Sequence, residues 1–240
     1  MASILIRRLL TACLILLGVA AITFVLLYAM PADPARMIAG RSATAETVAN
    51  IRHELGLDQP LPVQFWHYLS GLLQGNLGRS YAQKTDVATL IWSRLPATLT
   101  LMAAGIAIEV ILGLILGITA AVKRGSAIDN LVMMTSFIGV SAPQFIVALL
   151  LLYVFAVTLG WFPMSGYGTF AHVVLPATTL GILGAGWYAR MARSAMIDVL
   201  NQDYVRTARA KGLSSARILL RHALPNALLP IIAMIGIDIG

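Results

Sequence analysis

Long apolar runs dominate this chain and decide what it can fold into. The first, from Leu9 to Met30, contains no charged residue and is long enough to cross about 30 Å of hydrocarbon as a helix. Charged residues make up only 11% of the chain and hydrophobic residues 59%, whereas a soluble globular protein carries about 25% charged residues. The sequence therefore predicts an all-α integral membrane protein, a polytopic helical bundle.

A secretory signal peptide is the alternative interpretation of the first apolar run. Arg7 and Arg8 precede the run, as basic residues precede a signal core, but signal cores are only about 7–15 residues long. No clear A-x-A cleavage pattern follows the run. We therefore expect residues 1–30 to hold the N-terminal region and an uncleaved first transmembrane helix.

The rest of the chain divides by polarity. Residues 31–96 are mixed and more polar, and they predict an extramembrane segment with short amphipathic helices, one capped by Thr44 and one begun by Pro62. Residues 97–240 form the predicted core, with transmembrane helices over about 97–122, 131–159 and 173–189 and a partial one over 227–240. The chain is expected to stop within this fifth span, and a basic loop over 190–225 precedes it.

The distribution of Lys and Arg predicts the orientation. With the N-terminus in the cytoplasm, the inner side holds Arg7 and Arg8, Lys123 and Arg124, and the basic segment 190–222. The outer basic residues all lie in one long loop, and long loops count little in the positive-inside rule, by which cytoplasmic loops carry an excess of Lys and Arg. Basic residues in the cytoplasmic loops thus account for the net charge of +7. Because no basic face with interleaved stacking aromatics is visible, we expect no nucleic-acid partner.

Patterns for bond chemistry are missing from the sequence. No Gly-Lys pair occurs, so the chain has no phosphate-binding P-loop. His53 and Glu54 lack the second histidine of a zinc helix, and no G-x-S-x-G turn is present. Cys13 is the only cysteine and cannot form an internal disulfide. We expect no catalytic residue, no metal site and no cofactor bound by this chain.

One ionisable residue, Glu109, lies inside the first four predicted spans. Gly105, Gly113 and Gly117 share its helix face at four-residue spacing, and such stripes allow another helix to approach closely. Glu109 is therefore expected to face protein rather than lipid. Its role stays open between a buried structural hydrogen bond and a residue of a translocation path or proton relay.

The third predicted span is interrupted. Proline removes a backbone donor and kinks a helix, and broken helices at membrane depth can line substrate sites. Lining of a pathway and a purely structural kink both remain open for Ser141, Pro143 and Gln144.

The basic segment contains a predicted helix–Gly–helix element. Residues 203–211 read as a helix that Gly212 ends, and Ser214 can cap a second helix from Ser215. Periodicity alone allows simple anchoring by positive charges on the inner side. It also allows docking to a partner protein.

The same segment resembles the EAA loop of bacterial ABC importer permeases. Arg206, Thr207 and Ala208 stand where that pattern has Glu-Ala-Ala, and Gly212 takes its glycine position. His222, Leu224 and Pro225 occupy the Ile-x-Leu-Pro end. The first two EAA positions and the Ile position depart from the general pattern, and Pro225 replaces an expected basic residue and should bend the end of the element. The resemblance implies contact with an ATPase subunit by eight residues: Asp203, Tyr204, Arg206, Thr207, Ala208, Arg209, Gly212 and Leu213.

Other segments narrow the resemblance to the dipeptide/oligopeptide/nickel branch and to its first, B-type, permease. They occur in order along the chain: RRLL, PADPAR, LGLDQPLPVQF, GNLGRSY, LGWFPMSGYG, YVRTARAKGLS and NALLP. The likeness implies the transmembrane domain of an ABC type I importer in the bacterial cytoplasmic (inner) membrane. Its implied partners are a second homologous permease, two cytoplasmic ATPase subunits that bind ATP and Mg, and an extracytoplasmic substrate-binding protein.

The function implied by this resemblance is translocation of di- or oligopeptides by alternating access, without enzyme activity in this chain. The same machinery importing nickel or another small solute is the first alternative. A membrane receptor or scaffold that transports nothing is the alternative from a different class.

Overall fold

A computed structural model describes residues 2–29, 34–40, 43–80 and 83–239. The chain divides into two compact units, Met1–Arg94 and Leu95–Gly240, which are taken separately below. The expected boundary between the first span and the extramembrane segment, at residues 30 and 31, lies outside the described residues. The expected all-α membrane architecture is confirmed, since the only strands among these residues are two strands of two residues each, which pair as one hairpin.

The first unit contains one apolar helix and a set of short elements. Helix α1, Ala2–Ala29, is long and apolar enough to cross a membrane over Ser3–Leu26. Phe24 of α1 packs against Phe65 and Tyr68 of α4, with ring centroids 5.3 and 5.9 Å apart. The remaining elements of this unit are α2 (Pro34–Ala39), α3 (Ala45–Glu54), α4 (Leu61–Leu73), β1 (Arg79–Ser80) and β2 (Thr85–Asp86).

Two of these short helices, α3 and α4, begin at or next to the predicted positions, whereas α2 was not predicted. The Thr44 hydroxyl accepts a hydrogen bond from the Thr47 N–H at 3.2 Å and so caps α3. Gly56 follows α3 with φ +65°, as expected for a glycine that ends a helix. His53 and Asp58 form a 2.6 Å ion pair, and that carboxylate raises the pKa of the His53 imidazole.

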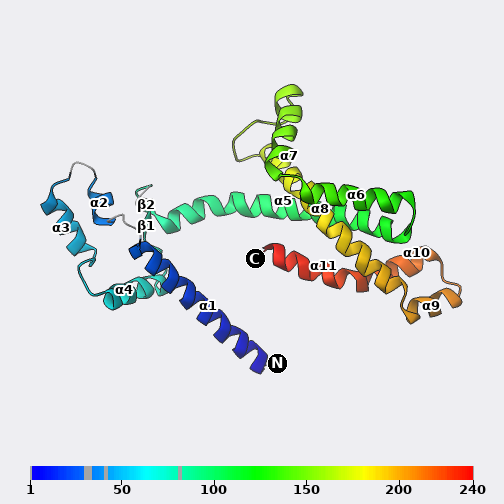
Figure 1. Cartoon of the computed structure of the whole chain (residues 1–240), viewed down its shortest axis with the longest axis horizontal. Coiled ribbons are helices and arrows are strands. Elements are labelled where there is room, and N and C mark those ends of the chain that lie inside the picture. The colour runs from blue at the N-terminus through cyan, green and yellow to red at the C-terminus, as the bar shows by residue number, and fades with distance from the viewer. Residues whose placement is uncertain (1, 30–33, 41–42, 81–82, 240) are drawn as a thin grey trace. The chain divides into compact units, whose positions relative to one another are not determined.

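The second unit is a bundle organised around α8. Figure 1 shows α8 running diagonally from α7 to the α9 turn, with α6 on one side and α11 on the other, and these helices contact it. The elements are α5 (Val87–Val122, which starts in the first unit), α6 (Ala127–Ser141), α7 (Gln144–Leu151), the π-helix η1 (Leu152–Thr158), α8 (Phe170–Leu200), α9 (Asp203–Ala210), α10 (Ser215–Arg217), the π-helix η2 (Ile218–Ala223) and α11 (Leu224–Ile239).

Four helices among the described residues are long and apolar enough to cross a membrane: Ser3–Leu26, Val87–Val122, Phe170–Leu200 and Ser215–Ile239. Three of them extend beyond the expected spans. Helix α5 begins at Val87 instead of near residue 97, so residues 87–96 belong to this helix and not to the extramembrane segment. Helix α8 continues to Leu200 instead of ending near residue 189 because Ala189, Ala192 and Met196 keep a buried face at helical spacing. The last helix starts at Ser215 rather than near residue 227, so it includes the second half of the basic segment.

The third expected span is two helices rather than one kinked helix. Helices α6 and α7–η1 meet at 100°. Ala142 and Pro143 both have extended backbone, with ψ 131° and 124°. The proline accounts for Ala142, because it pushes the residue before it out of the helical region. An ordinary proline kink keeps the helix direction approximately, whereas two successive extended residues redirect the chain.

Candidate functional site

The helix–Gly–helix element forms as predicted around a Schellman motif. The Leu213 N–H donates to the Ala208 carbonyl at 3.3 Å, and the Gly212 N–H donates to the Arg209 carbonyl at 2.9 Å. Gly212 has φ +77°, a conformation in which a side chain with a Cβ is strained. Ser214 stands at the N-cap position of the second helix, but its side chain makes no capping hydrogen bond.

The element has a buried face and an exposed face. Val205, Ala208 and Ile218 form a small core, against which Leu200 and Leu213 pack. Of the eight predicted contact residues, Ala208 is therefore buried within this chain and Leu213 is half-buried. The other six are exposed: Asp203, Tyr204, Arg206, Thr207, Arg209 and Gly212.

The exposed face is held by local contacts. Arg206 lies 3.3 Å from Asp203 in an exposed ion pair, and the Thr207 hydroxyl donates to the Asp203 carbonyl at 3.0 Å. Asn226 of α11 donates from Nδ2 to the Tyr204 hydroxyl at 3.1 Å. Tyr204 thus links α9 to the last helix, a contact between residues 22 positions apart.

The second half of the element continues directly into the last helix. Helices α10, η2 and α11 form one apolar helix, Ser215–Ile239. Its π-helical segment ends two residues before Pro225. A proline inside a helix removes one hydrogen bond and crowds the carbonyl four residues earlier, and the wider π turn relieves that crowding. The result is a mechanical connection from the loop to a membrane span.

The glycine stripe around Glu109 packs against α8, as the sequence predicts. A Cβ on Gly113 would collide with the Tyr188 side chain, and one on Gly117 would lie 2.7 Å from Ala192 Cβ. The Glu109 carboxyl group itself contacts α8 at Gly184, where no side chain intervenes. The expected placement of Glu109 against protein is therefore confirmed.

A second carboxylate near Glu109 escaped the sequence analysis. Tyr188 of α8 donates a hydrogen bond to Asp238 of α11. Asp238 and Glu109 line the same hollow of about 340 Å³, together with Thr98 and Met102. The sequence shows Asp238 as an acidic residue in the apolar run after residue 227. It does not show that Asp238 lies near Glu109, because that proximity arises only when α11 packs beside α5.

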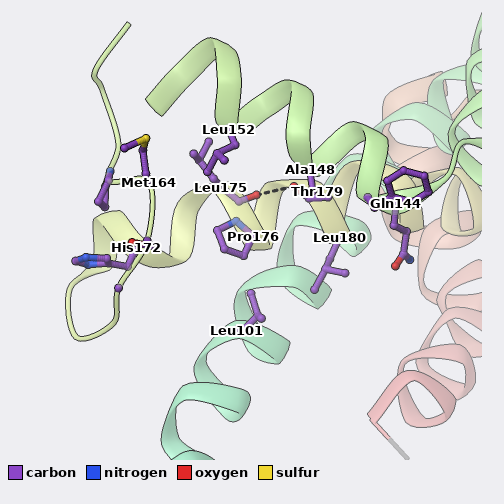
Figure 2. Close-up of a pocket in the computed structure, with 14 residues that line it drawn as sticks. Leu101, Gln144, Ala148, Leu152, Met164, His172, Leu175, Pro176, Thr179 and Leu180 are labelled. Carbon is purple, nitrogen blue, oxygen red and sulfur yellow. Dashed lines mark hydrogen bonds between the residues drawn. The ribbon is translucent and has the colours of Figure 1, made fainter. Parts of the chain in front are cut away.

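The interrupted span borders a larger, mostly apolar cavity of about 490 Å³. Figure 2 shows Gln144 at one end of this cavity and His172 with Met164 at the other. Of the residues predicted at the interruption, Gln144 lines the cavity; the residues that line it include neither Ser141 nor Pro143. Leu101 and Leu180 line both this cavity and the hollow of Glu109, so the two spaces are adjacent.

An ion pair between α6 and α8, formed by the buried Asp129 and the half-buried Arg193, also escaped the sequence analysis. Arg193 donates from Nε to Asp129 Oδ1 at 2.6 Å and from Nη2 to Asp129 Oδ2 at 2.7 Å. Asp129 lies between the predicted spans 97–122 and 131–159, and Arg193 lies in the predicted basic loop 190–225, so the sequence analysis did not expect them to pair inside the bundle. No local pattern joins residues 64 positions apart.

Comparison with known proteins decides the family. The model of the binding-protein-dependent transport system inner membrane component matches residues 110–240, and the model of its N-terminal region matches residues 1–102. This chain is a binding-protein-dependent ABC importer permease. Its transmembrane part is that of a type I importer, and it belongs to the peptide/nickel branch that the sequence motifs indicate.

Curated relatives of this permease are similar over nearly its whole length. Glutathione transport system permease protein GsiC of Salmonella typhimurium is 44% identical over 234 residues, which cover 98% of this chain and 76% of that protein. The proteins of the same name from Pectobacterium atrosepticum and Escherichia coli K12 are each 43% identical over 235 residues, 98% of this chain and 77% of theirs. Membership in a transport family disfavours the alternative of a receptor or scaffold without transport, and the permease itself is not an enzyme.

Proposed function

We propose that this permease forms, with a second homologous permease, the pathway by which a bacterial inner-membrane importer takes up peptides or peptide-like solutes. Two cytoplasmic ATPase subunits bind ATP and Mg and drive it, and an extracytoplasmic binding protein delivers the substrate. The names of the relatives support a peptide-like substrate, since glutathione is a tripeptide. Import of nickel or another small solute by the same machinery is the competing substrate assignment.

The observation that carries this proposal is the continuity of the basic element with a membrane helix. Its exposed half offers Tyr204, Arg206 and Arg209 to a partner, and its second half continues as the helix Ser215–Ile239. A force applied to α9 by an ATPase subunit would reach this span through the apolar core that Val205 and Ala208 share with Ile218. Alternating access follows when closure of the ATPase pair moves this element and the spans open outward.

The pathway assignment remains part of this proposal. Gln144 and Glu109 stand at the two adjacent hollows of the second unit, and the break at Ser141 and Pro143 lets the chain change direction at membrane depth. Backbone that is not helical is tolerated there only against protein or a water-filled space. Among these residues, we propose Gln144 as the one that contacts the substrate, because it lines the larger cavity.

Uptake by the assembled transporter tests the function. Proteoliposomes that contain both permeases, the ATPase subunits and the binding protein should accumulate labelled glutathione or a labelled dipeptide only with ATP inside. Nickel serves as the competing substrate. Uptake of nickel with no uptake of either peptide would reverse the substrate assignment, and uptake without the ATPase subunits would contradict the mechanism.

The orientation yields a separate prediction. Glu46→Cys in α3 and Lys123→Cys in the α5–α6 turn, each in a Cys13→Ser background, place single thiols at exposed positions. An impermeant thiol reagent should label the first in intact spheroplasts and the second only after lysis, because positive loops stay inside. The reverse pattern would invert the topology.

A further inference from the structure

The Asp129–Arg193 pair has the geometry of a fixed joint. Two parallel hydrogen bonds of 2.6 and 2.7 Å connect the carboxylate and the guanidinium, and such a bidentate pair fixes orientation as well as distance. The Asp129 side chain is 3% exposed and that of Arg193 27%. The pair is therefore shielded, in contrast to the exposed Arg206–Asp203 pair of α9.

The same aspartate also organises the turn between α5 and α6. The Gly125 N–H donates to Asp129 Oδ2 at 2.9 Å, and Gly125 has φ +79°. The Ser126 hydroxyl accepts from the Asp129 N–H at 3.4 Å at the start of α6. Asp129 is thus bound from its own turn and from α8 at once, and the orientation of the turn depends on Arg193.

The packing around α8 continues from Arg193 to the helix–Gly–helix element Asp203–Ala223, which we call the coupling element because the proposed function places it against an ATPase subunit. Met196 lies one turn beyond Arg193 on α8 and is fully buried with Ala121 of α5, Ala223 of η2 and Ala227 of α11. Leu200, at the end of α8, packs against the core of the α9–η2 element. The ends of three helices and the coupling element therefore share contiguous packing.

We propose that Asp129 and Arg193 are positioning residues that make the α5–α6 turn and the coupling element move as one body during the transport cycle, an inference that rests on the proposed function. Apolar packing through alanines permits sliding of one helix along another. A shielded bidentate pair does not, because any displacement leaves two charges without partners. The turn thereby transmits motion of α8 to α5 and α6.

Distances between two spin labels, measured by pulsed electron paramagnetic resonance, test the proposed role of the Asp129–Arg193 pair. Spin labels at Lys123 in the turn and Lys211 beside the coupling element, in a Cys13→Ser background, should give one narrow distance distribution. The distribution should be the same in the nucleotide-free and ATP-bound states of the assembled transporter. Arg193→Gln should broaden this distance distribution. Arg193→Lys keeps the charge but cannot form two parallel hydrogen bonds with Asp129, so its distribution should have an intermediate width.

Transport per ATP hydrolysed provides the second readout. This ratio should fall in Arg193→Gln, because ATP hydrolysis would continue while α5 and α6 no longer follow the movement of α8, and membrane insertion should be unchanged. If Arg193→Gln does not insert, the double variant Asp129→Asn/Arg193→Gln carries no uncompensated charge and should show the same broadening. If the distance distribution stays narrow and unshifted in these variants, and transport per ATP hydrolysed is unchanged, the proposed role of the Asp129–Arg193 pair is wrong.

Failure of the joint and failure of the proposed function give different results. The distance measurement is repeated on the two permeases without ATPase subunits, where it does not depend on docking. Broadening in Arg193→Gln there supports the joint even if the ATPase subunits bind elsewhere on the permease. A parent distribution that shifts between nucleotide states of the assembled transporter would contradict the joint while leaving transport intact.

Discussion

Replacing Gly113 with alanine is expected to separate α5 from α8 and to prevent normal assembly of the permease. The added Cβ would occupy the position of the Tyr188 side chain and would lie 3.1 Å from the Ala185 carbonyl oxygen. Backbone atoms cannot move aside as a flexible side chain can. Overpacking of a close interface costs about 1–3 kcal/mol, and the displaced Tyr188 would also lose its hydrogen bond to Asp238.

The measurement is the thermal midpoint of the detergent-solubilised transporter and the fraction recovered as a single assembled species. Gly236→Ala is the matched control because it adds the same methyl group to a glycine of α11 whose Cβ position has no neighbour within 4 Å. Gly113→Ala should lower both quantities, and Gly113→Leu should lower them further. Equal midpoints for Gly113→Ala and Gly236→Ala would contradict the close α5–α8 contact.

Gly212→Val is expected to abolish stimulation of ATP hydrolysis by substrate while the protein still inserts in the membrane. Valine at φ +77° is strained by about 1–3 kcal/mol, so the turn should open and rotate α9 away from α10. Val205 and Ala208 would then leave the core that they share with Ile218. The exposed face of α9 would then no longer fit the surface of the ATPase subunit that we propose it contacts.

Two variants separate backbone shape from side-chain loss at this turn. Gly212→Asn should retain most stimulation because asparagine tolerates the left-handed conformation. Arg209→Ala should also retain most of it, since an exposed charge contributes little. Stimulated hydrolysis is measured in proteoliposomes with the ATPase subunits and the binding protein. Wild-type stimulation in Gly212→Val would mean that this turn does not couple the permease to the ATPase.

Local sequence signals predicted the features that depend on local chemistry. Apolar runs located the membrane helices, and the four-residue spacing of glycines identified the face of α5 that meets α8. Gly212 marked the end of α9 because a helix that stops in a Schellman motif needs a left-handed residue. These features follow from the length, periodicity and backbone freedom of a single segment.

Features that join distant segments could not be found in this way. Asp129 and Arg193 lie on helices whose relative register is fixed by packing, with Gly186 against the backbone of α6 at Ser136. The 100° bend between α6 and α7 depends on two consecutive extended residues, while Pro143 alone predicts only a kink. Asp238 was missed for the same reason, since it meets Tyr188 only after α11 packs on α8.

The burial of Ala208 shows a limit of reasoning by resemblance. The motif predicted eight residues as one contact set, but the helical period of α9 turns Val205 and Ala208 inward. This inward face could have been read from the sequence, because Val205 and Ala208 are apolar residues at i and i+3 and so share one face of α9. The exposed residues of the set remain the candidates for partner contact.

Site-specific photo-crosslinking tests the central claim, that the α9 element contacts an ATPase subunit, most directly. A photoreactive residue replaces Arg206, whose side chain is 79% exposed, in the transporter assembled in membranes. Leu229 of α11, 65% exposed on an apolar helix, is the control position. The account predicts an ATP-sensitive adduct between position 206 and an ATPase subunit and none from position 229. The absence of an adduct at position 206, in a transporter that hydrolyses ATP and takes up substrate normally, would contradict it.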